Sequence, residues 1–150
     1  MSAPTLASPS VHRTIVGVGE AGASSQPGVV LSAYGLGSCV AVLGYDPVVR
    51  AGGLLHVMLP HSKVSPGRAL AQPTIFADTG LPELLSLLTA LNCSRRSLRF
   101  LVTGGAALQC VNDAFQIGAR NVAAVTQFLA ENNHLPPRSV VGGSLSRTVH

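Results

Sequence analysis

The sequence predicts an α/β fold: a single-domain layered sandwich in which a mixed, largely antiparallel sheet is covered by two main helices. The chain has 150 residues, a length that suits one domain with a buried core. Short β-branched, apolar runs alternate with glycine-rich turns near the N-terminus, and two later segments carry apolar residues at helical spacing. We expect a disordered tail over residues 1–11 and the folded domain over residues 12–150.

Strands are predicted where short apolar runs lie between turn residues. Such runs occupy residues 13–18, 29–34, 39–45, 53–59, 97–103, 139–141 and 147–149. Because short turns join the second, third and fourth runs, we expect antiparallel pairing among them. Residues 19–27 and 61–72 are rich in turn-forming and polar residues and are predicted to be loops. A helix that begins at Cys39 is the alternative for the third run, and its dipole would lower the pKa of the thiol.

Two helices are predicted from apolar residues that recur every three or four positions. The first runs from about Asp78, a favourable N-cap residue, to about Asn92. Its apolar face carries Leu81, Leu84, Leu85, Leu88 and Leu91. The second runs from Gly118 to Asn132, and its apolar face carries Val122, Val125, Phe128 and Leu129. These apolar faces are expected to pack on the sheet.

The composition narrows the classes of partner. Only 11% of the residues are charged, so part of a sparsely charged surface is expected to be covered by a partner. The net charge is +4, but the basic residues are scattered and aromatic residues make up only 4%. Nucleic-acid binding is therefore not expected, and an acidic protein partner fits better. No apolar run reaches transmembrane length and the first residues lack a signal-peptide pattern, so we expect a cytoplasmic protein without membrane insertion.

The three cysteines are Cys39, Cys93 and Cys110. An odd number without a paired framework argues against a secreted disulfide scaffold. The sequence contains no C-x-x-C motif and no close Cys/His cluster, so we expect no metal, and we expect no cofactor either. Cys93 and Cys110 have no motif around them and are expected to behave as small buried hydrophobic residues.

Cys39 and His56 each lie beside a glycine-rich turn and an apolar run, within the segments 35–42 and 52–60. A thiol paired with an imidazole is the minimal set for acyl transfer on an amide. Backbone N–H groups at Gly37, Ser38 or Cys39 are placed to bind the negative oxygen that forms during such a reaction. The plainer alternative is that Cys39 is a small buried hydrophobic residue and His56 a core histidine.

Several sequence blocks together resemble the chemoreceptor glutamine deamidase family, CheD. The cysteine and the histidine are 56 − 39 = 17 residues apart, and the blocks follow one another in the family order. The blocks are Leu36-Gly37-Ser38-Cys39-Val40-Ala41-Val42, Tyr45-Asp46-Pro47, Gly52-Gly53, His56-Val57-Met58-Leu59-Pro60, Ala77-Asp78, Gly104-Gly105-Ala106, Ile117-Gly118-Ala119-Arg120-Asn121, Val141-Gly142-Gly143 and Arg147-Thr148-Val149.

The resemblance implies a cysteine-dependent amidohydrolase of bacterial chemotaxis. Such an enzyme converts glutamine side chains in the cytoplasmic helical domain of chemoreceptors to glutamate, and it releases ammonia through a cysteine thioester. The family nucleophile corresponds to Cys39 and the family base to His56. Some members bind the phosphatase CheC, so a CheC-type phosphatase is a candidate partner.

Two departures from the family pattern bear on function. The third catalytic residue of the family is a threonine six positions before the cysteine, and position 39 − 6 = 33 is Ala33 here. Ser32, a backbone carbonyl or a water is expected to orient the imidazole instead, although adjacent strand residues point to opposite faces. The chain also stops at His150, where family members usually continue with more sheet, which raises the prospect that a C-terminal strand is lacking.

These departures keep two alternatives open beside an active deamidase. The first is a catalytically weak, CheD-like binding module that docks a chemotaxis phosphatase or a receptor. The second is a cysteine hydrolase that acts on another substrate. Gly104 and Gly105 are expected to let backbones pack closely near the site, and Arg120-Asn121 to make internal hydrogen bonds. The short turn before Cys39 predicts an open site that suits a glutamine on a protein surface.

Overall fold

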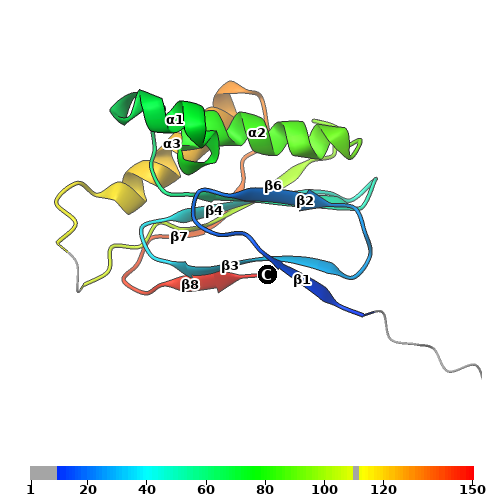
Figure 1. The fold of residues 1–150 in the computed structure, drawn as a ribbon, viewed down its shortest axis with the longest axis horizontal. Coiled ribbons are helices and arrows are strands. Elements are labelled where there is room, and N and C mark those ends of the chain that lie inside the picture. Colours follow the sequence, from blue (N-terminus) through cyan, green and yellow to red (C-terminus); the bar gives the residue numbers. More distant parts are fainter. Residues whose placement is uncertain (1–9, 110–111) are drawn as a thin grey trace, which may run out of the picture.

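The structure is a computed structural model that describes residues 10–109 and 112–150. It has three layers: helices, a five-stranded sheet and a three-stranded sheet (Figure 1). This confirms the predicted α/β sandwich, with two sheets where the sequence predicted one. Residues 1–9 of the expected tail and Cys110 lie outside the described residues.

The five-stranded sheet forms the middle layer. Its order is β2 (Ala21–Ser24), β5 (Ala51–Val57), β4 (Val40–Asp46), β6 (Arg99–Gly104) and β7 (Arg138–Val141). All neighbours pair antiparallel except β6 and β7, which are parallel. Side chains alternate between the two faces, so Val42 and Leu55 face the helices while Ala41 and Leu54 face the other sheet.

The three-stranded sheet covers part of the second face. Its order is β1 (His12–Ile15), β3 (Val29–Leu36) and β8 (Arg147–Val149), with β1 parallel and β8 antiparallel to β3. The β3–β8 register shifts between Ala33 and Leu36. Both of these side chains are buried, and they form a second, smaller core with Ala41 and Leu54.

The helical layer contains α1 (Pro66–Ala71), α2 (Ala77–Ala90) and α3 (Ile117–Glu131), with the 3-10 turns η1 (Ser62–Val64) and η2 (Pro73–Ile75). The main core lies between α2, α3 and the five-stranded sheet. Leu81, Leu84 and Leu88 are fully buried there, as their helical spacing predicted. Each fully buried leucine stabilises the fold by about 2 kcal/mol.

The predicted antiparallel pairing is confirmed for β4 and β5 but is wrong for β3 and β4, which lie in different sheets. Gly35 has a φ of +64°, a backbone conformation that favours glycine, and it lies in the register shift of β3 just before residues 37–39 lead the chain from one sheet to the other. A short turn between two apolar runs is compatible with a hairpin and with a corner between packed sheets. The chain forms a corner here because β3 and β4 bury side chains on the facing sides of two sheets.

Two segments predicted to be loops contain regular structure. The strand β2 is built from Ala, Gly and Ser, which carry no β-branched signal, and it forms because its backbone pairs with β5. The helix α1 buries no residue. It therefore needs no apolar face, and the sequence carries no helical periodicity that would have predicted it. Asp78 is not an N-cap: it is the second residue of α2, and its carboxylate accepts hydrogen bonds from the N–H and the hydroxyl of Ser62 at 2.9–3.0 Å.

Candidate active site

Cys39 ends the turn between β3 and β4, and Val40 begins β4 directly after it. The alternative of a helix at Cys39 is therefore wrong. The thiol is half-buried and packs against the core between the two sheets, which includes Ala41 and Leu36. This position leaves Cys39 at the end of a strand, where the sheet borders the helix α3 and the loop after β6.

His56 lies on the same face of the sheet as Cys39. The β4–β5 ladder pairs Val40 with Val57 and Ala41 with His56. When this register is carried on by one residue, Cys39 lies opposite Met58, and Cys39 and His56 become diagonal neighbours. Side chains in that relation start about 7 Å apart, within reach of a cysteine and an imidazole that turn toward each other.

The imidazole of His56 is 2% exposed and is held in one tautomer. Its Nδ1 lies 3.2 Å from the carbonyl oxygen of Val16. A carbonyl only accepts hydrogen bonds, so Nδ1 carries the proton and Nε2 of the neutral ring is an acceptor. Nε2 is buried and has no hydrogen-bond partner among the described residues. His56 is therefore arranged as a base whose proton-accepting nitrogen is free.

The segment before β2 wraps around His56. The N–H of His56 donates to the carbonyl of Glu20, and the N–H of Gly19 donates to the carbonyl of His56, both at 2.9 Å. Gly19 has a φ of +72°, and a Cβ there would come within 2.6 Å of Ile75. Sequence reasoning missed the role of Val16, because a backbone carbonyl leaves no residue-type signal. The glycines on either side of Val18 are the only trace of this turn in the sequence.

Burial shifts both groups toward their neutral forms. It raises the pKa of the Cys39 thiol above its usual range. It also lowers the pKa of His56, while the Val16 carbonyl and the Glu20 carboxylate oppose that shift. A helix dipole that lowers the thiol pKa, the alternative considered from the sequence, is not at work here. The described residues offer Nε2 of His56 no hydrogen bond, the Cys39 thiol included, so proton transfer to His56 as a general base would require the two side chains to turn toward each other.

Three consecutive carbonyls of the Cys39 turn accept hydrogen bonds from outside the turn. The carbonyls of Gly37 and Cys39 accept from the N–H groups of Ala106 and Gly105, at 2.8 and 2.9 Å. The carbonyl between them, that of Ser38, accepts from the side-chain amide of Asn121 at 3.0 Å. The turn is therefore anchored by the loop after β6 and by α3.

The same bonds decide which N–H groups can receive an oxyanion. The N–H of Gly37 donates to the carbonyl of Gly35 at 2.9 Å and is not free. The N–H groups of Ser38 and Cys39 have no hydrogen-bond partner in the part of the chain that the structure describes. Of the predicted donors, Ser38 and Cys39 remain, and Gly37 contributes the carbonyl that fixes the turn.

Gly104 and Gly105 bring the loop after β6 close to the turn, as expected from the sequence. Gly105 has a φ of +66°, and a Cβ there would come within 2.6 Å of Val122. Gly118, at the start of α3, is packed as tightly, because its Cβ would meet the Gly105 carbonyl oxygen at 2.5 Å. Glycine at these positions lets the loop and α3 approach Cys39 together.

The two residues considered as orienting groups have other surroundings. Ala33 is fully buried in the core between the sheets and offers His56 no hydrogen-bonding group. The hydroxyl of Ser32 lies 2.9 Å from Nδ1 of His150, and Ser32 is fully buried. Since neighbouring residues of β3 point to opposite faces, Ser32 points away from the face that Ala33 shares with His56. The Val16 carbonyl, one of the expected alternatives, contacts His56 instead.

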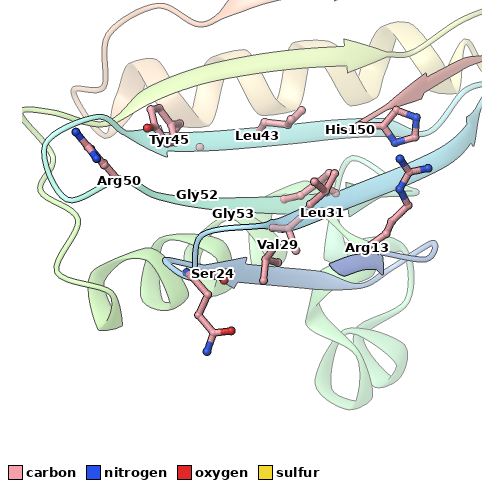
Figure 2. A pocket seen from close by; sticks show the side chains of 14 residues that line it. Arg13, Ser24, Val29, Leu31, Leu43, Tyr45, Arg50, Gly52, Gly53 and His150 are labelled. Atoms are coloured by element: carbon pink, nitrogen blue, oxygen red, sulfur yellow. Dashed lines mark hydrogen bonds between the residues drawn. The ribbon is translucent and has the colours of Figure 1, made fainter. Parts of the chain in front are cut away.

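A groove of about 610 Å³ lies at the far end of β4 from Cys39 (Figure 2). Apolar side chains of β3 and β4, including Leu31 and Leu43, line its floor, and Arg13, Arg50 and His150 lie along its edge. Among the described residues no cysteine lines it, and its one lining histidine, His150, lies 2.9 Å from the hydroxyl of the buried Ser32. Cys39 therefore remains the candidate nucleophile.

The described residues contain no group of three His, Cys, Asp or Glu side chains close enough to hold a metal ion. None of the helices in that part of the chain is long and apolar enough to cross a bilayer.

Comparison with known proteins decides the family. The family model described as "CheD chemotactic sensory transduction" matches residues 58–150. The chain is 42% identical over 89% of its length to a probable chemoreceptor glutamine deamidase CheD 2 of Anaeromyxobacter dehalogenans, of which it covers 84%. The chain belongs to the CheD family. Similar relatives occur in Syntrophotalea carbinolica, at 42% identity over 90% of this chain and 85% of the relative, and in Solibacter usitatus, at 39% over 93% and 82%. Both are named probable chemoreceptor glutamine deamidase CheD.

The two candidate catalytic residues of this CheD protein precede the stretch that the family model matches. The alignment with the Anaeromyxobacter relative nevertheless includes them. It spans 134 residues, so at most 150 − 134 = 16 residues lie outside it, and both Cys39 and His56 are farther than that from either end.

Proposed function

We propose that this CheD protein is a chemoreceptor glutamine deamidase, which hydrolyses side-chain amides of receptor glutamines to glutamate and ammonia. One observation carries the proposal. The half-buried Cys39 thiol lies beside the N–H groups of Ser38 and Cys39 and shares a sheet face with the His56 imidazole, and neither those N–H groups nor His56 Nε2 has a partner among the described residues. The names of the relatives support the choice of substrate. A receptor's cytoplasmic helical domain as substrate implies that the protein works in the cytoplasm.

The proposed reaction has two halves. Cys39 Sγ attacks the side-chain carbonyl carbon of the glutamine while its proton passes to His56 Nε2. The N–H groups of Ser38 and Cys39 bind the oxyanion. When the tetrahedral intermediate collapses, the C–N bond breaks and the leaving amine takes the proton from His56, which yields ammonia and a thioester. A water then gives a proton to His56 and attacks the thioester, the C–S bond breaks, and the thiolate takes back the proton as glutamate leaves.

The surroundings of Cys39 suit a protein substrate. A pocket of about 210 Å³ lies beside the turn and is lined by Ser38, Ala106, Leu108 and Phe115, among others. Phe115 is 74% exposed, an apolar surface that a partner protein can cover. A glutamine that projects from a receptor helix can reach the thiol while its neighbours contact this surface. A CheC-type phosphatase remains a second proposed partner, on the family resemblance.

The test measures ammonia release from a purified receptor cytoplasmic fragment. We expect Cys39→Ala to abolish release and His56→Gln to lower the rate about 10² to 10⁴-fold, because His56 accepts the thiol proton. Cys93→Ala and His12→Gln are matched controls away from the site, and we expect them to keep the parent rate.

Unchanged deamidation by Cys39→Ala would refute the nucleophile. Faster turnover of free glutamine than of the receptor fragment would favour a general glutaminase. Binding of the receptor fragment without ammonia release, by a protein shown to be folded, would favour the binding-module alternative.

A further inference from the structure

Asn121 connects the two halves of the site. It lies in the second turn of α3 and is fully buried. Its Nδ2 lies 3.0 Å from the carbonyl oxygen of Ser38 and 3.0 Å from that of Met58. Ser38 directly precedes Cys39, and Met58 follows His56 by two residues. One amide group therefore holds the nucleophile turn and the strand of the base together.

This contact falls where the sheet stops. The last backbone pair of β4 and β5 joins Val40 to Val57. Beyond it the N–H of Met58 turns away and donates to Ile75 at 2.9 Å. At this point the two N–H hydrogens of the Asn121 amide bond to the carbonyls of Ser38 and Met58, where another backbone pair of the two strands would otherwise follow.

The bond to Ser38 also sets the direction of a reacting group. The carbonyl of Ser38 and the N–H of Cys39 belong to one peptide group, which is planar and trans, so the two point in opposite directions. A donor that fixes the Ser38 carbonyl therefore also fixes the direction of the Cys39 N–H. The N–H of Cys39 is one of the two that lack a partner in the described segments. The other, that of Ser38, is aimed in the same way through the bond from Ala106 to the Gly37 carbonyl.

The Oδ1 atom of the Asn121 amide argues against a role in stability alone. Its Oδ1 is buried and has no hydrogen-bond partner among the described residues. A buried acceptor without a partner costs stability. Asn132, at the end of the same helix, shows the ordinary use of an asparagine: its Nδ2 donates to the carbonyl of Phe128 at 2.9 Å, beside the solvent-exposed end of the helix.

We propose that Asn121 is a positioning residue, which aims the Cys39 N–H at the oxyanion and ties it to the strand that carries His56. The inference rests on the proposed function for its role in deamidation. Without the amide, the Ser38–Cys39 peptide group can rotate, and acyl transfer to Cys39 loses a donor. Loss of one oxyanion donor slows acyl transfer about 10² to 10³-fold. Alkylation of the same thiol forms no oxyanion and does not need the donor.

The experiment compares two reactions of Cys39 in the full chain, acylation by p-nitrophenyl acetate and alkylation by iodoacetamide. The variants are Asn121→Leu, which keeps the branched shape and the number of side-chain heavy atoms, and Asn121→Ala, which adds no bulk. Cys39→Ala gives the background of each reagent, and Asn132→Ala is the matched control in the same helix. We expect acylation to fall about 10²-fold in the Asn121 variants, with the pH profile of alkylation unchanged and Asn132→Ala like the parent.

Rates are expressed per folded chain, with the folded fraction of each variant measured by circular dichroism. If acylation and alkylation fall together, Asn121 acts on the fold in general and the proposal is wrong. If neither falls, it is also wrong. Neither reagent is a receptor, so a parent chain that is acylated normally but releases no ammonia from receptor fragments contradicts the proposed function alone.

Discussion

Cys39 and His56 lie on one face of the sheet, and burial shifts both toward the neutral form by raising the pKa of the thiol and lowering that of the imidazole. A thiolate–imidazolium pair would need a cationic His56, and the desolvated ring resists that charge. The Val16 carbonyl strengthens this arrangement by holding the proton on Nδ1. The proposed role of His56 as the base therefore depends on an imidazole that stays unprotonated.

The first prediction concerns the pH dependence of deamidation. A protonated imidazole cannot accept the thiol proton, so activity is lost as the pH falls through the pKa of His56. Burial lowers that pKa below its ordinary value of about 6.5. We expect the acid limb of the kcat/KM profile to lie below pH 6.5, measured as ammonia release at subsaturating receptor fragment. An acid limb centred above 6.5 would indicate an ion pair with Cys39 instead.

The second prediction concerns Ala33, where the family resemblance places a threonine. Threonine and valine have nearly equal volumes, so either one overfills the fully buried position and costs about 1–3 kcal/mol of stability. Only threonine offers a hydroxyl to the imidazole. We expect Ala33→Thr to deamidate the receptor fragment faster than both Ala33→Val and the parent chain. Equal rates for the two variants would mean that the Val16 carbonyl already orients His56 fully.

At the scale of elements, the site depends on how closely α3 approaches the loop after β6. Gly105 of that loop bonds to the Cys39 carbonyl, and Asn121 of α3 bonds to the Ser38 carbonyl. The two elements touch through Gly118 and the Gly105 carbonyl. A change in this contact therefore moves both anchors of the Cys39 turn at once.

The third prediction tests this contact with Gly118→Ala. The new Cβ would lie 2.5 Å from the Gly105 carbonyl oxygen, so α3 or the loop has to shift. We expect a loss of about 1–3 kcal/mol in the free energy of unfolding, together with slower acylation of Cys39. Gly67→Ala is the matched control, because Gly67 is also the second residue of a helix and its Cβ would meet nothing within 4 Å.

Gly67→Ala is expected to be neutral or to stabilise the protein by about 0.4–1 kcal/mol. Denaturant unfolding and p-nitrophenyl acetate acylation measure both variants. A Gly118→Ala protein with parent stability and parent acylation would show that the helix adapts without moving the turn.

At the scale of the whole molecule, two buried histidines make stability depend on pH. His134 packs edge-on against Phe100 with ring centroids 5.1 Å apart, and neither ring nitrogen has a partner in the described chain. Burial lowers the pKa of His134, and the nearby Arg95 lowers it further. Burial also lowers the pKa of His56. Burial in the fold thus favours the neutral form of both rings.

The fourth prediction is that stability falls as the solution becomes acidic. The unfolded chain binds protons at these histidines near pH 6.5, whereas the folded chain binds them only at lower pH. Stability is therefore complete above about pH 6.5 and is lost as the pH falls from there toward the lowered folded pKa values. Urea unfolding across this range measures the slope, and His134→Phe should reduce it. Stability that rises as the pH falls would contradict the assignment.

The sequence by itself determined the elements that carry their own periodicity and the residue types that carry chemistry. The leucine spacing of α2 and the apolar runs of β4, β5 and β6 predict their places in the fold. The glycine-rich turns mark Cys39 and His56 as candidates. The double glycine at 104–105 predicts close packing near them, and the structure confirms it. Such features are local, because side-chain size, branching and glycine act on their own stretch of backbone.

The tertiary structure alone decided what the backbone contributes to the site. No residue type predicts that the Val16 carbonyl contacts His56, that the Gly37 N–H is already bonded, or that the chain changes sheets between β3 and β4. Asn121 was expected to make internal hydrogen bonds, but its two carbonyl partners lie 83 and 63 residues away in the chain. Every residue carries the same peptide group, so which groups meet, and which N–H stays free, is settled only when distant segments pack together.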